Sequence, residues 1–339
     1  MSHFLRKSLG AGFGYVPGEQ PADGEGWIKL NTNESPLPPS PRVAAAVSAA
    51  AGALNRYPHP RAEPLRSALA AHLEVEPSQV VVGNGADALI NDCLRAFCEP
   101  GTTVLVTEPT YSLLPVAASI HGVRTHAVAL DGAGRFAGEF ATADAPLRFF
   151  VNPNTPTGTW CEPEELARAL HGAPGVVVID EAYCDFAPRS CIPLLADHPS
   201  WIVLRTFSKS HALAGLRVGY AVAATGLIAD LEAVGESYPV DRCAIAGALA
   251  ALADVEHHRR IVDQVVSERS RLEAALEEAG WLVTPSQANF VCAVPPSGTS
   301  ADAAAGLRER RVLVRCFATG LRITVGTAAE NDALLAALG

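Results

Sequence analysis

Residues 201–220 hold the residue types whose spacing first suggests chemistry, because a short apolar run there ends in a polar turn. The turn contains Lys209, and Arg217 follows eight positions later. A lysine placed where a buried strand ends can lose part of its hydration, which lowers its pKa and leaves an amine able to condense with a carbonyl. The hydroxyls of Thr206 and Ser208, with the guanidinium of Arg217, suit a phosphate. Taken alone, a solvated lysine and a surface arginine also explain the segment, since both residue types are rarely buried.

Composition and charge narrow the class of protein. The chain has 339 residues, of which 49% are hydrophobic and 18% charged, and this argues against general disorder. Its net charge of −10 and the lack of a Lys/Arg run argue against nucleic acid as a main partner, so an anionic ligand needs a local positive site. No apolar run is long enough for a signal peptide or a membrane span, so we expect a soluble, cytoplasmic protein with no membrane partner.

The cysteines and histidines give no metal-site pattern. Eight cysteines are scattered along the chain, with no C-x-x-C pair and no Cys/His cluster at metal-ligand spacing. In a chain of this size without a secretory signal, reduced and buried thiols are expected. We therefore predict no metal, and we interpret His257 and His258, in a charged helical segment, as part of a solvated face.

Short apolar segments rich in β-branched residues recur from Gln79 onward and predict seven strands. These strands are expected at 80–83, 104–107, 125–129, 149–151, 176–180, 202–204 and 218–223. Ala- and Leu-rich segments between most of them predict helices at 86–97, 113–120 and 162–170. Strands that are apolar throughout, with helices between them, indicate the α/β class and a mostly parallel seven-stranded sheet covered on both faces. Ligands of such sheets bind beyond the carboxyl ends of the strands, so the polar residues after each strand are candidate site residues.

The pattern divides the chain into three parts. Residues 1–41, rich in Gly, Pro and Asn, predict an N-terminal arm that packs on other surfaces. Residues 42–238 predict the large domain, which begins with helices near 42–54 and 64–73. Residues 239–339 predict a smaller α+β domain. Its helices are expected at 244–252, 259–279 and 332–338, and its strands at 281–284, 289–294, 312–315 and 321–325.

Three of the predicted strands are followed by segments that could contact a ligand. Residues 83–87 form a glycine-rich turn that opens a helix, where free backbone N–H groups favour an anion, although a helix cap by Asp87 explains the turn as well. Tyr111 follows the next strand and offers a ring for stacking, with core packing as the alternative. The turn 152–158 is rich in amides and hydroxyls and lies at the same edge of the sheet.

Asp180 ends an apolar strand, where a carboxylate is unfavourable unless it is paired. It is expected to meet a cation or a protonated heteroatom, and a salt bridge to Arg205 or Arg217 is the competing explanation. One ligand would use all of these strand-end residues. It has a planar ring with a protonatable nitrogen, a phosphate arm and an aldehyde for Lys209, which describes pyridoxal 5′-phosphate.

Further motifs stand in order along nearly the whole chain: YVPGEQP (15–21), KLNTNESP (29–36), LNRYP (54–58), GNGAD (83–87), LRAFCEPG (94–101), PTY (109–111), NPNTPTG (152–158), DEAY (180–183), SKSHALAGLRVGY (208–220) and GLRITVGT (320–327). In this order and spacing the chain resembles the class I/II aminotransferases, which are pyridoxal-phosphate enzymes of fold type I. Within that family it is most similar to the histidinol-phosphate branch.

The resemblance implies roles for the residues around the cofactor ring. Lys209 is expected to form the Schiff base and then to act as the base that moves the substrate proton. Asp180 is expected to keep the ring nitrogen protonated, and Tyr183 to hydrogen-bond the ring oxygen. Tyr111 is expected to stack on the ring. The family often has Asn directly before Pro-Thr-Gly, where this chain has Asn154 and then Thr155, so either residue could contact the ring oxygen.

The resemblance also implies how the phosphate and the substrate are held. The cofactor phosphate is expected to contact residues from two segments, namely Gly85, Ala86 and Asp87 through their backbone, and Thr206, Ser208 and Arg217. Tyr57 would reach the cofactor phosphate of a neighbouring subunit, which implies a homodimer. Arg322 would clamp a substrate carboxylate. Arg322, Arg315 and Tyr15 are candidates for a substrate phosphate, and Asn33 lines the same pocket.

These implications predict a ping-pong aminotransferase that exchanges the amine of L-histidinol phosphate with 2-oxoglutarate. An aminotransferase for another amino acid, aromatic or biosynthetic, is an alternative on the same scaffold. A decarboxylase of the threonine-phosphate type keeps the cofactor and changes the reaction. A non-catalytic binding protein with this fold is the alternative from another class, and the presence of Lys209, Asp180, Tyr183 and Arg217 argues against it.

Overall fold

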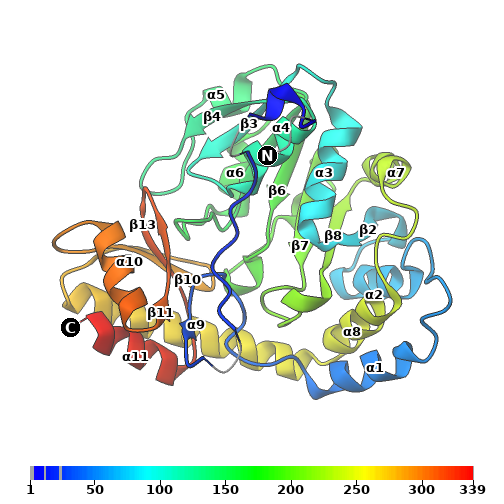
Figure 1. Cartoon of the computed structure of the whole chain (residues 1–339). Coiled ribbons are helices and arrows are strands. Elements are labelled where there is room, and N and C mark those ends of the chain that lie inside the picture. The colour runs from blue at the N-terminus through cyan, green and yellow to red at the C-terminus, as the bar shows by residue number, and fades with distance from the viewer. Residues whose placement is uncertain (1–3, 11–12, 23–24, 339) are drawn as a thin grey trace.

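The computed structural model describes residues 4–10, 13–22 and 25–338, which build two larger sheets that each carry helices of their own and one small two-stranded sheet (Figure 1). The larger sheet has seven strands in the order β2-β8-β7-β6-β5-β3-β4. Its strands are β2 (Val80–Asn84), β3 (Thr103–Glu108), β4 (Arg124–Ala129), β5 (Leu147–Val151), β6 (Val176–Asp180), β7 (Trp201–Thr206) and β8 (Val218–Ala223). The α/β class and the mostly parallel seven-stranded sheet predicted from the sequence are confirmed.

One strand of this sheet, β8, runs antiparallel to both of its neighbours, β2 and β7. The reason is the short connection from β7 to β8, residues 207–217, because a parallel crossover needs about a dozen residues or more and usually a helix. The chain therefore turns back at the carboxyl end of β7. This turn carries both Lys209 and Arg217, so the short connection keeps them at the same edge of the sheet.

Helices cover both faces of the seven-stranded sheet, as the unbroken apolar strands require. One face packs on α3 (Gly85–Phe97), α4 (Leu113–Ile120) and α7 (Thr225–Val234) through strand residues such as Val178 and Ile202. The other face packs on α2 (Glu63–Leu73), α6 (Pro163–Ala169) and α8 (Arg242–Ala253) through residues such as Val177 and Val203. Helix α1 (Pro41–Ala51) packs against α8. The sequence analysis had not predicted α7.

The second sheet has four antiparallel strands in the order β12-β13-β10-β9. They are β9 (Leu282–Thr284), β10 (Phe290–Val294), β12 (Arg315–Phe317) and β13 (Gly320–Thr324). Three helices share its core, α9 (Val255–Glu278), α10 (Ser300–Glu309) and α11 (Ala328–Leu338). In Figure 1 the long helix α9 runs beneath the molecule from α8 to this second sheet.

The N-terminal residues contact both parts of the molecule. Arg6 donates to the carbonyl of Ile120 at the end of α4, at 2.6 Å. Further along, β1 (Ile28–Lys29) pairs in parallel with β11 (Val312–Leu313) beside the second sheet. The arm therefore crosses from one part to the other. The short elements are α5 (Glu139–Thr142) and the 3-10 turns Lys7–Leu9, Pro77–Gln79, Cys184–Phe186, Ile192–Leu194 and Ala214–Leu216.

The structure corrects two details of the second domain. The predicted strand 312–315 is two strands, β11 and β12, which pair with different partners on either side of Val314. Helix α10 was missed, although Thr299 and Asp302 form a capping box at its start that marks a helix N-terminus. The predicted domain boundary at 238/239 stays a prediction, and α8, just after it, packs on α1 and α2.

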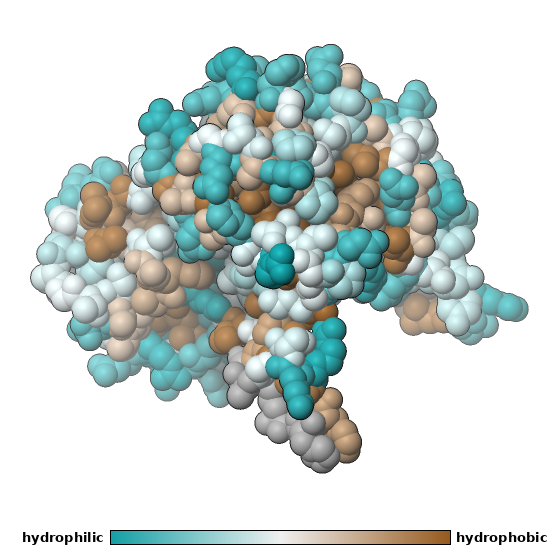
Figure 2. Space-filling model, turned by 90° about the horizontal axis from the view of Figure 1, so that it is seen from above, coloured by the Kyte–Doolittle hydropathy of each residue, from teal (hydrophilic) through white to brown (hydrophobic). Residues whose placement is uncertain are grey.

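The outer surface mixes polar and apolar residues. The face seen in Figure 2 shows teal hydrophilic and brown hydrophobic residues interspersed over the molecule. Within the described part of the chain, no helix combines the length and the apolar character that crossing a membrane requires.

Gly219 in β8 lets the start of α3 lie directly against the sheet, and its replacement tests this contact. A Cβ at residue 219 would lie 2.5 Å from the backbone nitrogen of Ala86 and 2.6 Å from the carbonyl carbon of Gly85. Backbone cannot move aside as a side-chain end can, so Gly219→Ala should destabilise the protein by about 1–3 kcal/mol. Urea unfolding monitored by circular dichroism measures this loss.

Gly215→Ala is the matched control, because a Cβ there meets nothing within 4 Å. It should change stability by less than about 0.5 kcal/mol in either direction, as surface substitutions usually do. Equal unfolding curves for the two variants would contradict the close packing of α3 on β8.

Candidate active site

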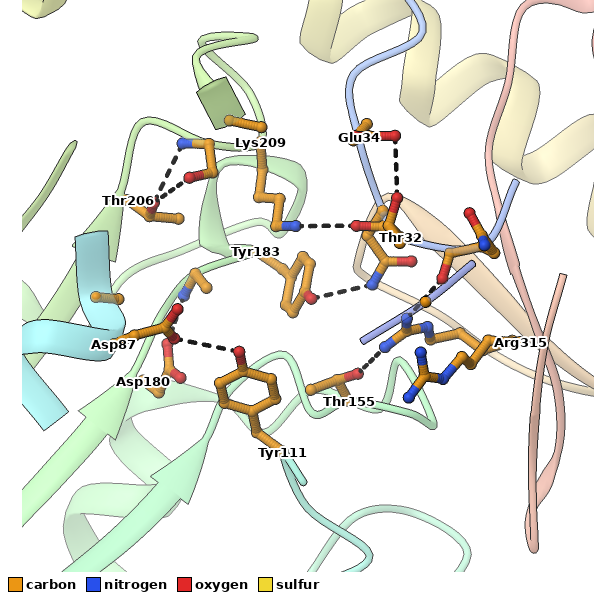
Figure 3. A pocket seen from close by; sticks show the side chains of 18 of the residues that line it. Thr32, Glu34, Asp87, Tyr111, Thr155, Asp180, Tyr183, Thr206, Lys209 and Arg315 are labelled. Carbon is orange, nitrogen blue, oxygen red and sulfur yellow. Dashed lines mark hydrogen bonds between the residues drawn. The ribbon is translucent and has the colours of Figure 1, made fainter. Parts of the chain in front are cut away.

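A cavity of about 220 Å³ opens at the carboxyl ends of the strands and collects most of the predicted site residues. It is lined from three directions: by the N-terminal arm, by loops of the large sheet and by strands β12 and β13. The predicted residues that line it are Tyr15, Asn33, Ala86, Asp87, Tyr111, Thr155, Asp180, Tyr183, Thr206, Ser208, Lys209, Arg217, Arg315 and Arg322. Figure 3 shows ten of the lining residues labelled around this space.

Lys209 extends its amine into the cavity from the turn after β7. Its Nζ donates to the carbonyl of Thr32 at 3.3 Å and lies 5.6 Å from the centre of the Tyr183 ring. Figure 3 shows the amine pointing across the space toward Thr32. Burial lowers the pKa of Lys209 to about 8, and the positive charge of Arg322 acts in the same direction. A substantial fraction of this amine is therefore neutral, and nucleophilic, near neutral pH.

Asp180 ends β6 with its carboxylate almost fully buried, 3% exposed. Its Oδ1 accepts from the backbone N–H of Ala182 at 3.0 Å, and within the described residues no cation forms a salt bridge with it. Burial raises its pKa to about 7. The alternative salt bridge to Arg205 or Arg217 is absent there, because Arg205 pairs with other carboxylates and Arg217 pairs with Asp87. The carboxylate is left available for a protonated ligand atom.

Tyr183 lies beside the amine of Lys209 and is hydrogen-bonded to the N-terminal arm. Its hydroxyl accepts from Asn33 Nδ2 at 3.0 Å, as Figure 3 shows, and its ring packs edge-on against Phe290. Burial raises its pKa, while the Arg322 guanidinium opposes that rise. Asn33 is itself fixed, because its backbone N–H donates to Thr324 Oγ1 at 2.9 Å. The phenol is therefore held neutral and oriented toward the cavity.

An anion site lies where α3 begins. Helix α3 has no side-chain cap, so its first backbone N–H groups are free to bind an anion. Arg217 stands beside them, with Nη1 3.4 Å from Ser208 Oγ and Nη2 3.1 Å from Asp87 Oδ2. Thr206 Oγ1 lies 3.0 Å from Ser208 Oγ. The N-terminus of α3, the Arg217 guanidinium and the two hydroxyls together form a cradle that can bind a phosphate.

Gly85 is needed to keep this cradle open. Its φ is +74°, a conformation that L side chains rarely adopt, and a Cβ would lie 2.7 Å from Arg217 Nη2. Gly85 does not line the cavity itself, but it places Ala86 and Asp87 there. The Asp87 carboxylate also accepts from the hydroxyl of Tyr111 at 3.1 Å, so the tyrosine ring is fixed at the wall of the cavity.

Two arginines on neighbouring strands form a second positive region. Arg315 in β12 and Arg322 in β13 are register partners and both line the cavity. Arg322 donates to Thr155 Oγ1 at 2.9 Å and to the carbonyl of Asn31 at 3.1 Å, while its buried Nε has no hydrogen-bond partner in the described chain. Within the described residues neither arginine forms a salt bridge. Burial lowers the pKa of Arg322, because the charged guanidinium loses hydration there.

Two predicted residues lie away from the cavity. Asn154 turns away from the cavity, and its Nδ2 donates to Thr157 Oγ1 of its own loop and to Pro109 O of the loop after β3. Of the two candidates for the ring oxygen, Thr155 is therefore the one whose side chain the structure brings to the cavity. Tyr57 is 77% exposed and stacks on Tyr238 with ring centres 4.5 Å apart.

The sequence analysis missed four cavity residues from the N-terminal arm, Gly18, Asn31, Thr32 and Glu34. Thr32 receives the hydrogen bond from Lys209, and Glu34 forms an ion pair with Lys29. Burial alone would raise the pKa of Glu34, but the hydrogen bond and charge of Lys29, the Thr32 hydroxyl and the charge of Lys209 together outweigh burial, and the pKa is lowered. The available signal was the polar run 31–35 directly after a short apolar piece, which resembles the strand-end clusters elsewhere in the chain.

Comparison with known proteins gives consistent matches over nearly the whole chain. Residues 25–338 match the family described as aminotransferase class I and II. The chain is 44% identical to histidinol-phosphate aminotransferase 2 of Thiobacillus denitrificans, over 99% of this chain and 97% of that protein. It is also 44% identical to histidinol-phosphate aminotransferase 1 of Bradyrhizobium diazoefficiens, over 96% and 95%. A crystal structure of histidinol-phosphate aminotransferase from Sinorhizobium meliloti in complex with pyridoxal 5′-phosphate superposes with a TM-score of 0.84, at 30% identity, over 91% of this chain and 89% of that one.

The depressed pKa of Lys209 can be tested by its reactivity in the cofactor-free protein. An amine acylates only when it is neutral, and the neutral fraction rises as the pH rises through the pKa. Acylation of Lys209 should therefore be half-maximal near pH 8, more than two pH units below an ordinary lysine at about 10.4. Mass spectrometry of the digested protein measures the labelling of each lysine across pH.

The chain simplifies this measurement, because it contains only three lysines, Lys7, Lys29 and Lys209. Exposed Lys7 provides an internal reference in the same digest. If Lys209 and Lys7 followed the same pH profile, the proposed desolvation of Lys209 would be wrong.

Proposed function

The chain belongs to the class I and II aminotransferase family, and on that premise we propose that it transfers the amino group of L-histidinol phosphate to 2-oxoglutarate. The observation that carries the proposal is the pair of uncompensated guanidiniums, Arg315 and Arg322, facing the amine of Lys209 across one cavity. The relatives that match over almost their full length are histidinol-phosphate aminotransferases, and they support this substrate. The cofactor is pyridoxal 5′-phosphate, with which a related enzyme has been crystallised.

The residues of the cavity fit this cofactor. Asp180 is a buried carboxylate without a cationic partner in the described chain, and it would hold the protonated ring nitrogen. The start of α3, with Arg217, Ser208 and Thr206, would hold the phosphate. A Cβ at Gly85 would fill the space beside Arg217, which explains the glycine at that position. When bound, the cofactor supplies a carbonyl that receives the amino group and a protonated ring that withdraws electrons from the substrate carbon.

Each side chain near the reacting atoms has one task. The neutral amine of Lys209 would take the proton from the substrate carbon and would then release it to complete the transfer of the amino group. Its pKa near 8 permits this at physiological pH. Tyr183, oriented by Asn33, would donate a hydrogen bond to the ring oxygen of the cofactor. Thr155 stands at the same wall and is fixed by Arg322, so we assign it, in place of Asn154, to the ring oxygen as well.

The two arginines account for both halves of a ping-pong reaction. The amino donor carries a phosphate, and the acceptor carries carboxylates, so one positive region can bind the anionic group of each in turn. Arg322 has a free Nε buried beside the cavity, and Arg315 is its partner across the two strands. Tyr15 and Asn33 complete this side of the cavity. The donor and the acceptor therefore occupy the same place at different times.

We infer further that the enzyme acts in the cytoplasm as a homodimer. Tyr57 and Tyr238 form an exposed stacked pair, 77% and 45% exposed, and such an aromatic pair is suited to an interface. Neither ring lines the cavity of its own chain. In a dimer Tyr57 would be contributed to the cofactor phosphate of the neighbouring site.

The substrate is tested by steady-state kinetics with a panel of amino donors and 2-oxoglutarate. L-Histidinol phosphate should give a kcat/KM at least about tenfold above aromatic and other biosynthetic amino acids, since a doubly charged phosphate can bond to the two arginines more strongly than a single carboxylate can. Glutamate formation measures the rate. A larger kcat/KM for an aromatic donor would overturn the substrate and leave the reaction class standing. Release of carbon dioxide from a phosphorylated amino acid would overturn transamination.

Arg322→Lys separates geometry from charge at the anion site. A lysine keeps the positive charge but loses the paired N–H groups that match a phosphate or carboxylate. The kcat/KM for the donor should fall by about 10–100-fold, corresponding to the 1.5–3 kcal/mol of a hydrogen bond to a charged group. The absorbance of the bound cofactor should not change.

The matched control is Arg308→Lys, because Arg308 is an exposed arginine of α10 that pairs with Glu19 outside the cavity. It should leave kcat/KM within about twofold, as expected for a surface ion pair. A similar loss in both variants would show that Arg322 does not bind substrate.

A further inference from the structure

Three side chains with metal-ligand chemistry converge outside the catalytic cavity. Asp185 comes from the 3-10 turn Cys184–Phe186, His211 from the turn after β7, and His258 from the first turns of α9. One ligand atom from each lies within 4.8 Å of those of the other two. None of the three lines the cavity around Lys209. The cluster therefore has no part in the function proposed above.

The two imidazoles present nitrogen atoms that nothing in the described chain satisfies. The rings of His211 and His258 stack with centres 4.2 Å apart. His211 Nδ1 and His258 Nε2 are both buried, and neither has a hydrogen-bond partner in the described residues. Asp185 Oδ2 is 3.5 Å from His258 Nε2, which is too long for a good hydrogen bond. A buried nitrogen left without a partner is unfavourable by about 1–3 kcal/mol, so two of them side by side indicate a missing ligand.

The net charge around the cluster also favours the binding of a cation. The buried guanidinium of Arg205 pairs with two carboxylates, those of Glu181 and Asp185, so the set carries one excess negative charge. A neutral imidazole is the form that coordinates a metal ion. The ligand types and the charge balance thus both favour a metal cation.

The cluster is accessible enough to exchange an ion. The side chains of His258 and Asp185 are 25% and 20% exposed, so one side of the cluster faces solvent. Two nitrogen ligands and one carboxylate oxygen suit borderline divalent ions such as Zn²⁺ and Co²⁺. Three protein ligands leave a coordination position for water.

We propose that Asp185, His211 and His258 form a binding site for a divalent transition-metal ion of the Zn²⁺ type. The bound ion joins three elements that are distant in sequence: the turn after β6, the turn that carries Lys209, and helix α9. Its role is structural, because it fixes the residue two positions after Lys209 to the start of α9. This differs from the interpretation of His257 and His258 as a solvated face, since His258 is half-buried against His211.

Cobalt binding to the holoenzyme tests the proposal, because Co²⁺ bound by nitrogen and oxygen absorbs visible light at longer wavelengths than the cofactor. Titration of the metal-free holoenzyme with Co²⁺ should give such bands at one ion per chain, and excess Zn²⁺ should remove them. His258→Ala should weaken Co²⁺ binding at least tenfold. His258→Gln, which keeps a polar side chain of similar length, serves as the second variant. When a chelator has removed the metal, both variants should unfold at the same temperature as the wild type.

His257→Ala is the matched control. His257 is the next residue on the same helix, and its ring contacts the carbonyl of Pro38, away from the cluster. It should bind Co²⁺ as the wild type does. Absence of the visible bands, equal affinity in both His258 variants and the wild type, or an intense sulfur-to-cobalt band from one of the eight cysteines would overturn the proposal.

Discussion

Desolvation at one edge of the large sheet is the constraint on which the active site depends. Strands β6 and β7 lie side by side and are buried along almost their whole length, so the groups near their carboxyl ends are largely removed from solvent. There burial lowers the pKa of Lys209 and raises that of Asp180. The two shifts bring an amine and a carboxyl group toward the same pH range from opposite sides. Burial is the largest cause of both shifts, and neighbouring charges, such as that of Arg322 for Lys209, add to it.

The same edge keeps its other charges away from Asp180 by pairing them with one another. Arg205 is bonded to Glu181 and Asp185, and Arg217 to Asp87. If either arginine formed a salt bridge with Asp180, the carboxylate would already have a cationic partner and could not pair with a protonated ligand atom. The neighbouring carboxylates therefore matter as much as the arginines, because an arginine that is paired with one of them does not form a salt bridge with Asp180.

The sequence allowed the scaffold to be predicted more fully than the contacts between distant segments. Continuous apolar runs predicted all seven strands of the large sheet, and the residues after them include most of the cavity wall. Helix α7 was missed because it follows β8 without a distinctive start, and its N-cap is Ala224 with no side-chain bond. Which of Asn154 and Thr155 has its side chain at the cavity depends on the conformation of one loop, and hydrophobic periodicity does not predict loop conformation. His258 acquires its surroundings only when remote segments meet.

The scarcity of lysine has a consequence for a protein that must hold a reactive aldehyde. Of 26 basic residues only three are lysines, so arginine supplies almost all of the positive charge. A guanidinium stays protonated and does not condense with a carbonyl at physiological pH, whereas any neutral amine can. Lys29 is engaged with Glu34, which leaves Lys7 as the sole exposed side-chain amine of the described chain. Selectivity for Lys209 thus arises partly from the rest of the chain, which offers the aldehyde few places to form an unproductive adduct.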